Sequence, residues 1–315
     1  MVKVIVGLMG SSVAQSGSTL STPAGMRELL DVCRRFGVQE LDTARVYSSG
    51  RSEELIGEVG AQQWFKISTK APGFSPGSLQ HDQVIANCDA SLAALRQDQV
   101  DIFYIHGPDS GTPISEVAQA FIELHRRGSY QRFGVSNVSP TVVEELHTLC
   151  AEAGSAVPSV YQGAYSPVHR TMEKELLPRL RKLGVAFYAW GPLAGGLLAK
   201  PIDQIMNPEK GSRYEAMRAQ LGPLYLRPEV LEPLKVLTAK CQEQSIPLAE
   251  ATLRWHMHHS ALGDNDGIIL GASTASQLEA GLKACQGGPL SSQLIDAFET
   301  LWQAIAPSSS FAWLP

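Results

Sequence analysis

Several features that would place a protein in a particular class are missing from this chain of 315 residues. No apolar run approaches the roughly 18 residues that a membrane-spanning helix needs. The first residues lead straight into a short β-like run, without the apolar core and cleavage site of a secretory signal. Neither end carries a lipidation signal. We therefore expect a cytoplasmic protein with no membrane partner.

Charge and cysteine are also scarce. Charged residues make up 18% of the chain, the formal net charge is −5, and no basic cluster is present, which argues against a nucleic acid as partner. No two cysteines have a CxxC spacing, and most lie in segments expected to be helical: Cys33, Cys88, Cys150, Cys241 and Cys285. This spacing favours reduced, buried thiols in a reducing compartment, with a reactive thiol as the alternative.

What the sequence does contain is a regular alternation of short apolar runs with longer amphipathic stretches. Most of the short runs are apolar through the middle, as strands buried on both faces are. Strand–helix repetition implies a parallel sheet, and eight units favour a closed (β/α)8 TIM barrel over the alternative of an open doubly wound sheet. The eight expected strands are Val4–Leu8, Gln39–Thr43, Trp64–Thr69, Asp101–His106, Phe133–Asn137, Ser159–Gly163, Val185–Trp190 and Ile268–Ala272.

The domain organisation expected from this pattern is simple. No linker rich in Gly, Ser and Pro divides the chain, so residues 1–315 are expected to form a single barrel domain. The longest irregular stretch is 191–228, which is rich in Gly and Pro. In a barrel, a stretch of this length is expected to form a long loop over the mouth, where cofactor and substrate would bind.

Four side chains with complementary chemistry lie at the ends of neighbouring strands. In such barrels the catalytic groups occupy the carboxyl ends of the strands. The second, third and fourth strands end with Asp42, Lys70 and His106, and Tyr47 follows in the loop after the second. Any one of these residues alone could be structural, as a cap, a solvated strand end or a core side chain.

Together, the four residues predict a device that protonates a developing alkoxide. A phenol with a pKa of about 10 is a poor proton donor at neutral pH, but a nearby ammonium lowers that pKa. Asp42 could compensate the charge of a buried Lys70. A neutral His106 could donate a hydrogen bond to a carbonyl oxygen and fix its position.

The sequence around these residues resembles the aldo-keto reductase superfamily, and the match covers nearly the whole chain. Its motifs are specific in combination: Leu41–Ala44 with Tyr47, Gly50 and Ser52-Glu53, then Ile67–Lys70, Asp101–Pro108 and Gly134–Asn137. Two later segments resemble the aflatoxin-aldehyde reductase branch, namely Gly191–Leu198 and Leu253–Ser260.

The resemblance implies an activity and a role for each residue of the tetrad. The activity is NADPH-dependent reduction of an aldehyde or ketone to an alcohol, by hydride transfer from the nicotinamide. Tyr47 would be the general acid, with Lys70 and Asp42 tuning it. His106 would position the carbonyl of a small-molecule substrate.

Cofactor contacts also follow from the resemblance. Ser136, Asn137 and Gln162 would hold the nicotinamide carboxamide, and Trp190 would stack on the nicotinamide ring. The glycine loop after the seventh strand would cover the pyrophosphate, because glycines let the backbone approach closely. The remaining contacts implied for NADPH (NADP⁺) are Met9, Gly191, Leu193, Gly195, Arg213, Gly271, Ser273 and Gln277.

The preference for NADPH over NADH is less firmly implied. Gly271, Ser273 and Gln277 would hold the adenosine end and its 2′-phosphate. Related reductases often carry Glu-Asn shortly after that glutamine, where this chain has Ala280 and Gly281.

The substrate side departs from the branch as well. Related reductases tend to carry an arginine in the long loop and another at the carboxyl terminus, where this chain has Leu221–Tyr225 and a tail over 305–315 that ends Phe311–Pro315. An apolar rim predicts an apolar or aromatic carbonyl substrate. The alternative is that another arginine of the long loop replaces the missing cation. The expected pocket residues are Phe74, Tyr225, Phe311 and Trp313.

Three histidines close one helical stretch, at His256, His258 and His259. Imidazolium groups suit the negative end of a helix dipole, which gives the cluster a structural interpretation. No carboxylate or cysteine is spaced to complete a metal site with them, so no metal is expected.

Two other functions remain as alternatives. One is a reductase-like subunit that binds NADPH and regulates a partner with little turnover. The other is a cofactor-free barrel isomerase or lyase that uses the same acid, amine and imidazole for proton transfer. The oligomeric state is open, with a homodimer among the alternatives.

Overall fold

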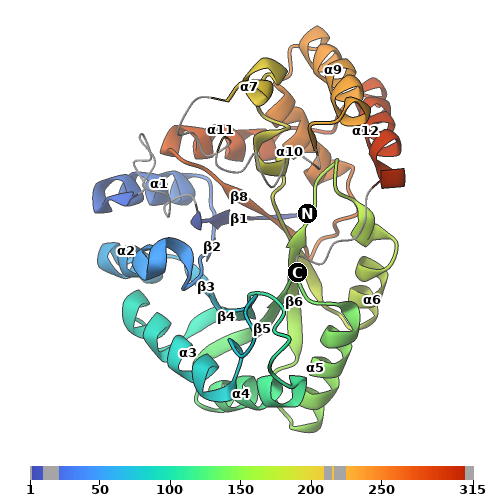
Figure 1. The fold of residues 1–315 in the computed structure, drawn as a ribbon. Helices are drawn as coiled ribbons and strands as arrows, with labels where there is room; N and C mark the ends of the chain where they lie inside the picture. Colours follow the sequence, from blue (N-terminus) through green and yellow to red (C-terminus); the bar gives the residue numbers. More distant parts are fainter. Residues whose placement is uncertain (1, 10–20, 209–214, 216–224, 309–315) are drawn as a thin grey trace.

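The strands of this chain close into one barrel (Figure 1). The computed structural model describes residues 2–9, 21–208, 215 and 225–308. All neighbouring strands are parallel and follow chain order, and the last strand pairs with the first. The strands are β1 Lys3–Gly7, β2 Glu40–Asp42, β3 Lys66–Ala71, β4 Val100–Ile105, β5 Tyr130–Ser136, β6 Pro158–Ala164, β7 Ala186–Trp190 and β8 Gly267–Gly271. The predicted (β/α)8 barrel is confirmed, and each expected strand lies close to its observed bounds.

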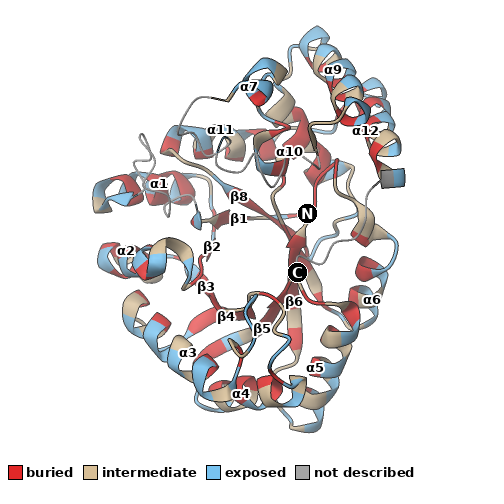
Figure 2. Cartoon of the chain, in the orientation of Figure 1, coloured by how far each residue is buried: buried red, intermediate tan, exposed pale blue. Residues whose placement is uncertain are grey.

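Helices surround the barrel and bury one face against it (Figures 1 and 2). They are α1 Pro23–Arg35, α2 Arg51–Val59, α3 His81–Leu95, α4 Ile114–Arg126, α5 Pro140–Glu152, α6 Leu176–Lys182, α7 Ile202–Met206, α9 Pro228–Glu243, α10 Leu248–His258, α11 Ala275–Cys285 and α12 Ser292–Ile305. Two short 3₁₀ turns, η3 Tyr47–Gly50 and η6 Ala194–Gly196, follow β2 and β7. The stretch expected to be irregular therefore contains η6 and α7, and its residues 209–214 and 216–224 lie outside the described part. Among the described helices, none has the length and apolar character that crossing a bilayer requires.

Local sequence signals fix where several of these helices begin. Thr22 and Ser139 each accept a hydrogen bond from a backbone N–H of the first turn, with proline in the first helical position after them. Hydroxyl caps satisfy donors that the helix leaves unpaired, and proline fits a position where no N–H is needed. Thr274 and Ser291 cap α11 and α12 in the same way. These caps fix the residues at which the four helices begin.

The inside of the barrel is filled by its own small apolar cluster. Its buried members are Ile5, Ile102, Tyr104, Val160, Tyr188 and Ile269. Gly134 makes room for one of them, because a Cβ at this position would lie 2.3 Å from the Tyr104 ring. A packed interior leaves the carboxyl ends of the strands as the place where a ligand can meet the barrel.

Polar residues close the amino-terminal end of the barrel. Arg132 donates to Asp101 at 3.1 Å from Nε and to Glu40 at 3.0 Å from Nη2. The Tyr188 hydroxyl donates to the same Glu40 carboxylate at 2.9 Å. Burial lowers the pKa of Arg132, but its hydrogen bonds to Asp101 and Tyr188 outweigh that effect and raise it. The guanidinium is therefore a permanent cation that joins four strands, β2, β4, β5 and β7.

The five cysteines are all buried and free, as expected. Burial raises the pKa of each thiol to about 11 or 12. Because the thiolate is the reactive form, this environment favours the prediction of inert thiols over the alternative of a reactive one.

The cluster around Arg132 makes a stability prediction. Replacing Arg132 with Met leaves Asp101 and Glu40 without their cation, and breaking a buried pair in this way costs about 3 kcal/mol or more. We expect a clearly lower thermal midpoint, measured by circular dichroism, with Tyr188→Phe as a milder control that keeps the ion pairs. A midpoint within about 2 °C of the wild type for Arg132→Met would contradict this account.

Candidate active site

The four residues expected to carry chemistry meet at the carboxyl end of the barrel. Asp42 ends β2, Lys70 lies near the end of β3, His106 follows β4, and Tyr47 opens the turn η3. The rings of Tyr47 and His106 stand edge to face with their centroids 5.8 Å apart. The Lys70 ammonium lies 5.2 Å from the centroid of the Tyr47 ring. A phenol, an imidazole and a cation therefore share one small region.

Lys70 and Asp42 form a buried ion pair beneath the tyrosine. Lys70 Nζ lies 2.7 Å from Asp42 Oδ1 and 2.7 Å from the carbonyl oxygen of Thr43. Burial lowers the pKa of Lys70, but the charge of Asp42 and the interaction with Tyr47 outweigh burial and raise it. Lys70 is therefore a cation that faces the Tyr47 phenol.

His106 is half-buried and neutral. Burial, assisted by the charge of Lys70, lowers the pKa of His106 to about 3. Its backbone is held on both sides, since its N–H donates to Ala71 at 3.2 Å and its carbonyl accepts from Asn137 Nδ2 at 3.1 Å. A neutral imidazole in a fixed frame can donate one ring N–H to a ligand oxygen.

The turn that carries Tyr47 has an unusual backbone. Ser48, Ser49 and Gly50 follow one another with φ of 52°, 54° and 94°. The left-handed region costs a non-glycine residue roughly 1–2 kcal/mol. Three such residues in a row make a tight turn that other contacts must hold in place.

A buried carboxylate, not given a role from the sequence, supplies that hold. Glu53 is fully buried and accepts from Arg45 Nη1 at 3.0 Å and from Thr69 Oγ1 at 2.5 Å. Arg45 lies two residues before Tyr47, and Thr69 lies directly before Lys70. Glu53 thereby ties the tyrosine turn to the lysine strand. The only sequence signal was its place in the motif after Tyr47, because the pairing joins residues from different elements.

Three residues expected to bind a carboxamide lie at the ends of β5 and β6. Gln162 Nε2 donates to Asp42 Oδ2 at 2.8 Å. Asn137, in the left-handed region with φ of 56°, donates from Nδ2 to Ser136 Oγ at 3.0 Å as well as to His106. Both amides donate N–H groups within the protein, and the acceptor oxygen of each amide and the hydroxyl of Ser136 are the groups that a carboxamide could bond to.

The next strand end carries Trp190 and the glycine loop. Trp190 is half-buried at the end of β7. In the loop that follows, Ala194, Gly195 and Gly196 have φ of 49°, 66° and 106°. Gly191 also has a positive φ, of 69°. Consecutive left-handed residues turn backbone N–H groups toward one side, and the loops after the seventh and eighth strands are where these barrels commonly bind phosphate.

The remaining expected cofactor contacts lie on the β8 side. Gly271 ends β8 and pairs with Gly7 of β1, so the segment that begins at Ser273 lies near the start of the chain. Ser273 N donates to Gln277 Oε1 at 3.0 Å. Met9 is 47% exposed just after β1. Arg213 lies outside the described residues.

One of the expected pocket residues, Phe74, stands directly against the tetrad. The Phe74 ring stands edge to face with His106, with centroids 5.6 Å apart, and is 42% exposed. Val46, which the sequence analysis did not single out, precedes Tyr47 and is 53% exposed. Tyr225 is half-buried and packs against the main hydrophobic core. Phe311 and Trp313 lie outside the described part of the chain.

The histidine cluster joins backbone segments. His256 Nε2 lies 3.1 Å from the carbonyl oxygen of Pro192, and His258 Nε2 lies 2.7 Å from that of Gly287. α10 turns His256 into the core, and burial lowers the pKa of His256 to about 4, so this ring is a neutral core side chain that bonds to the backbone. Within the described residues, no group of three or more metal-ligating side chains occurs.

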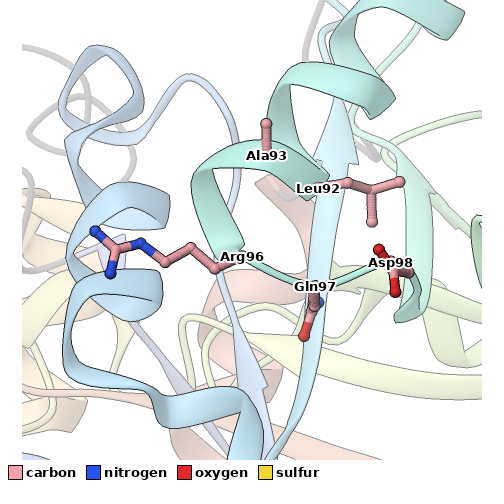
Figure 3. A pocket seen from close by; sticks show the side chains of 5 residues that line it. All are labelled: Leu92, Ala93, Arg96, Gln97 and Asp98. Carbon is pink, nitrogen blue, oxygen red and sulfur yellow. The ribbon is translucent and has the colours of Figure 1, made fainter.

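Two surface hollows lie away from these residues. The one in Figure 3 is lined by Leu92, Ala93, Arg96, Gln97 and Asp98, where α3 leads into the amino end of β4. A second is lined by residues of α3, α4 and the end of α5, including His81 and Arg126. Neither hollow is lined by Asp42, Tyr47, Lys70 or His106. The candidate site is therefore identified by the short distances between these four side chains.

Comparison with known proteins agrees with this geometry. The model of the Aldo/keto reductase family matches residues 3–303. Oxidoreductase sirO of Leptosphaeria maculans is 37% identical over 284 residues, which cover 89% of this chain and 86% of that protein. Aflatoxin B1 aldehyde reductase member 2 of Homo sapiens is 36% identical over 310 residues, or 93% of this chain and 85% of that protein. The motif resemblance is thereby confirmed, and the chain belongs to the aldo/keto reductase family of oxidoreductases, which reduce carbonyl groups.

Proposed function

We propose that this chain uses NADPH to reduce an aldehyde or ketone to an alcohol, with Tyr47 as the general acid. The observation that carries the proposal is the buried Lys70–Asp42 pair directly against Tyr47, with a neutral imidazole beside it. Proton donors of this kind contribute typically 10²–10⁴-fold to a rate.

The residues around the tetrad fit a nicotinamide. A carboxamide offers one oxygen that accepts and one NH₂ that donates. Ser136 can donate to that oxygen. The side-chain N–H groups of Asn137 and Gln162 donate within the protein, so their amide oxygens would accept from the NH₂. When bound, NADPH supplies the hydride that reaches the carbonyl carbon.

Each residue of the tetrad then has a defined task. His106 donates a ring N–H to the carbonyl oxygen and holds it beside the phenol. As negative charge develops on that oxygen, the Tyr47 hydroxyl gives up its proton to it. Lys70 stabilises the phenolate that remains, because its charge is already in place before the reaction begins. Asp42 keeps Lys70 protonated in a buried position.

Asp42 also joins two parts of the site. One carboxylate oxygen holds the Lys70 ammonium and the other holds the Gln162 amide. Gln162, which would orient the nicotinamide, and Lys70, which would stabilise the Tyr47 phenolate, therefore both bond to Asp42. We infer that hydride and proton delivery are aligned through Asp42.

Phe74, beside His106, and Val46, next to Tyr47 in the chain, support an apolar or aromatic substrate. Phe74 and Val46 expose large apolar surfaces at the ends of β3 and β2. Buried apolar area is worth roughly 25 cal/mol per Å², whereas a carboxylate buried without a partner costs several kcal/mol. Relatives named aldehyde reductases support an aldehyde as the reacting group.

The role of Tyr47 can be tested by Tyr47→Phe. We expect kcat to fall at least ~10²-fold because the proton donor is lost, while NADPH still binds with a similar Kd. Stopped-flow turnover of an aldehyde and titration of NADPH fluorescence measure the two effects. Turnover near the wild-type rate would remove Tyr47 from the mechanism. A wild-type chain that binds NADPH without reducing any aldehyde would instead favour a regulatory subunit.

The pH dependence tests the neutral state of His106. Since its pKa is lowered to about 3, His106 stays neutral as the pH falls from 8 to about 5.5, and its ability to donate to the substrate does not change. We expect kcat/KM over this range to show no fall centred near the ordinary histidine value of about 6.5. If kcat/KM instead fell with a midpoint near pH 6.5, and if this fall were absent in His106→Asn, the His106 imidazole would have an ordinary pKa.

Substrate preference tests whether Phe74 and Val46 form an apolar wall of the substrate pocket. We expect an aromatic aldehyde to have a kcat/KM at least ~10-fold above that of succinic semialdehyde, or about 1.4 kcal/mol in the transition state. Val46→Ser should reduce this ratio. The matched control is Val236→Ser, the same substitution at the same 53% exposure on α9, and it should leave the ratio unchanged. Equal or better use of succinic semialdehyde by the wild type would contradict the apolar wall.

A further inference from the structure

Two loops at the site lie backbone against backbone. One joins β3 to α3 over residues 72–80, and the other joins β4 to α4 over 106–113. Phe74 N donates to the carbonyl oxygen of Pro108 at 2.8 Å. A Cβ on Gly73 would lie 2.5 Å from the Gly107 oxygen, and one on Gly111 would lie 2.6 Å from the Gly77 nitrogen. Glycine at these positions lets the loops touch directly.

A single carboxylate fastens the two loops together. Asp109 Oδ1 accepts from the backbone nitrogens of Gly77 at 2.8 Å and Gly111 at 2.7 Å. Its Oδ2 accepts from Leu79 N and from Thr112 Oγ1, both at 2.7 Å. Partial burial would raise the pKa of Asp109, but these hydrogen bonds lower it below its usual value. The ionised carboxylate therefore bonds to both loops with both of its oxygens.

The fastened loop carries Phe74 in a conformation that needs support. Phe74 has φ of 69°, a region that aromatic residues rarely occupy. Its ring lies over Gly107, where a Cβ would come within 2.3 Å of the ring, and faces His106. A strained, partly exposed aromatic ring would leave this place if the loop relaxed.

We propose that Asp109 is a positioning residue for substrate selection. It holds the loop after β3 so that Phe74 presents its ring to the part of a carbonyl substrate that does not react. Asp109 lies on the β4 side and reaches across to the β3 side, so it can act on Phe74 without touching the substrate. This inference rests on the proposed reductase activity.

Asp109→Asn tests the positioning role with a substitution that keeps the size of the side chain. An asparagine has one acceptor oxygen instead of two, so its NH₂ would face two of the four donors. We expect the ratio of kcat/KM for an aromatic aldehyde to that for propanal to fall at least ~5-fold, the scale of a lost apolar contact. The change should come mainly through KM of the aromatic aldehyde, with the Kd of NADPH unchanged.

A matched control is available at the opposite end of the barrel. Asp98→Asn makes the same chemical change at an exposed residue beside the hollow in Figure 3, and the ratio should keep its wild-type value. If Asp109→Asn folds poorly, Thr112→Val removes one of the four hydrogen bonds and should lower the ratio in the same direction by a smaller factor.

A double-variant cycle decides whether Asp109 acts through Phe74. If it does, the double variant Asp109→Asn/Phe74→Ala should have the same ratio as Phe74→Ala alone, because the effects of two coupled residues do not add. An unchanged ratio in Asp109→Asn, or effects that simply add, would overturn the inference while the reductase activity stands. A wild type that reduces no aldehyde at all would overturn the proposed function, and this inference with it.

Discussion

The charge of Lys70 inside the barrel is the constraint on which the site depends. An ammonium removed from water costs several kcal/mol unless a counter-charge and further acceptors meet it. Asp42, at the end of β2, provides the counter-charge, and the carbonyl of Thr43, directly after β2, provides a further acceptor. This requirement fixes the register of β2 and β3 at their carboxyl ends. It also explains why Asp42 reaches the Gln162 amide of β6, since a buried carboxylate needs partners for both oxygens.

Around that pair, hydrogen bonds hold the loops, and the loop after β7 also buries Ala194, Leu197 and Leu198 in the main hydrophobic core. The turn after β2 and the turn after β7 each contain three consecutive residues with positive φ. Such turns have few alternative shapes once their ends are fixed. Glu53 fixes the first from within, and His256 meets the start of the second at Pro192. Contacts from other elements thus hold both turns in shape, and a fixed arrangement of charges and dipoles is what electrostatic catalysis requires.

The sequence predicted the barrel well because its signals are local. Each strand is a short apolar run, and the rule that catalytic groups follow strands selects Asp42, Lys70 and His106 without further knowledge. Contacts between loops could not be predicted in this way. Glu53 with Thr69, and Asp109 with Gly77, pair residues from different strand–helix units, which come together only when neighbouring units pack. The burial of His256 could not be predicted either, because the sequence shows a helix end but not which face of α10 turns inward.

The burial of the cysteines has a consequence for an enzyme that handles carbonyl compounds. Aldehydes and related electrophiles modify proteins chiefly at thiolates and at unprotonated amines. In this chain the five thiols are buried with raised pKa values, and the lysine nearest the reacting centre is kept protonated by its partner. Both features disfavour the addition of these groups to an aldehyde. The ion pair that keeps Lys70 charged therefore also disfavours its reaction with an aldehyde.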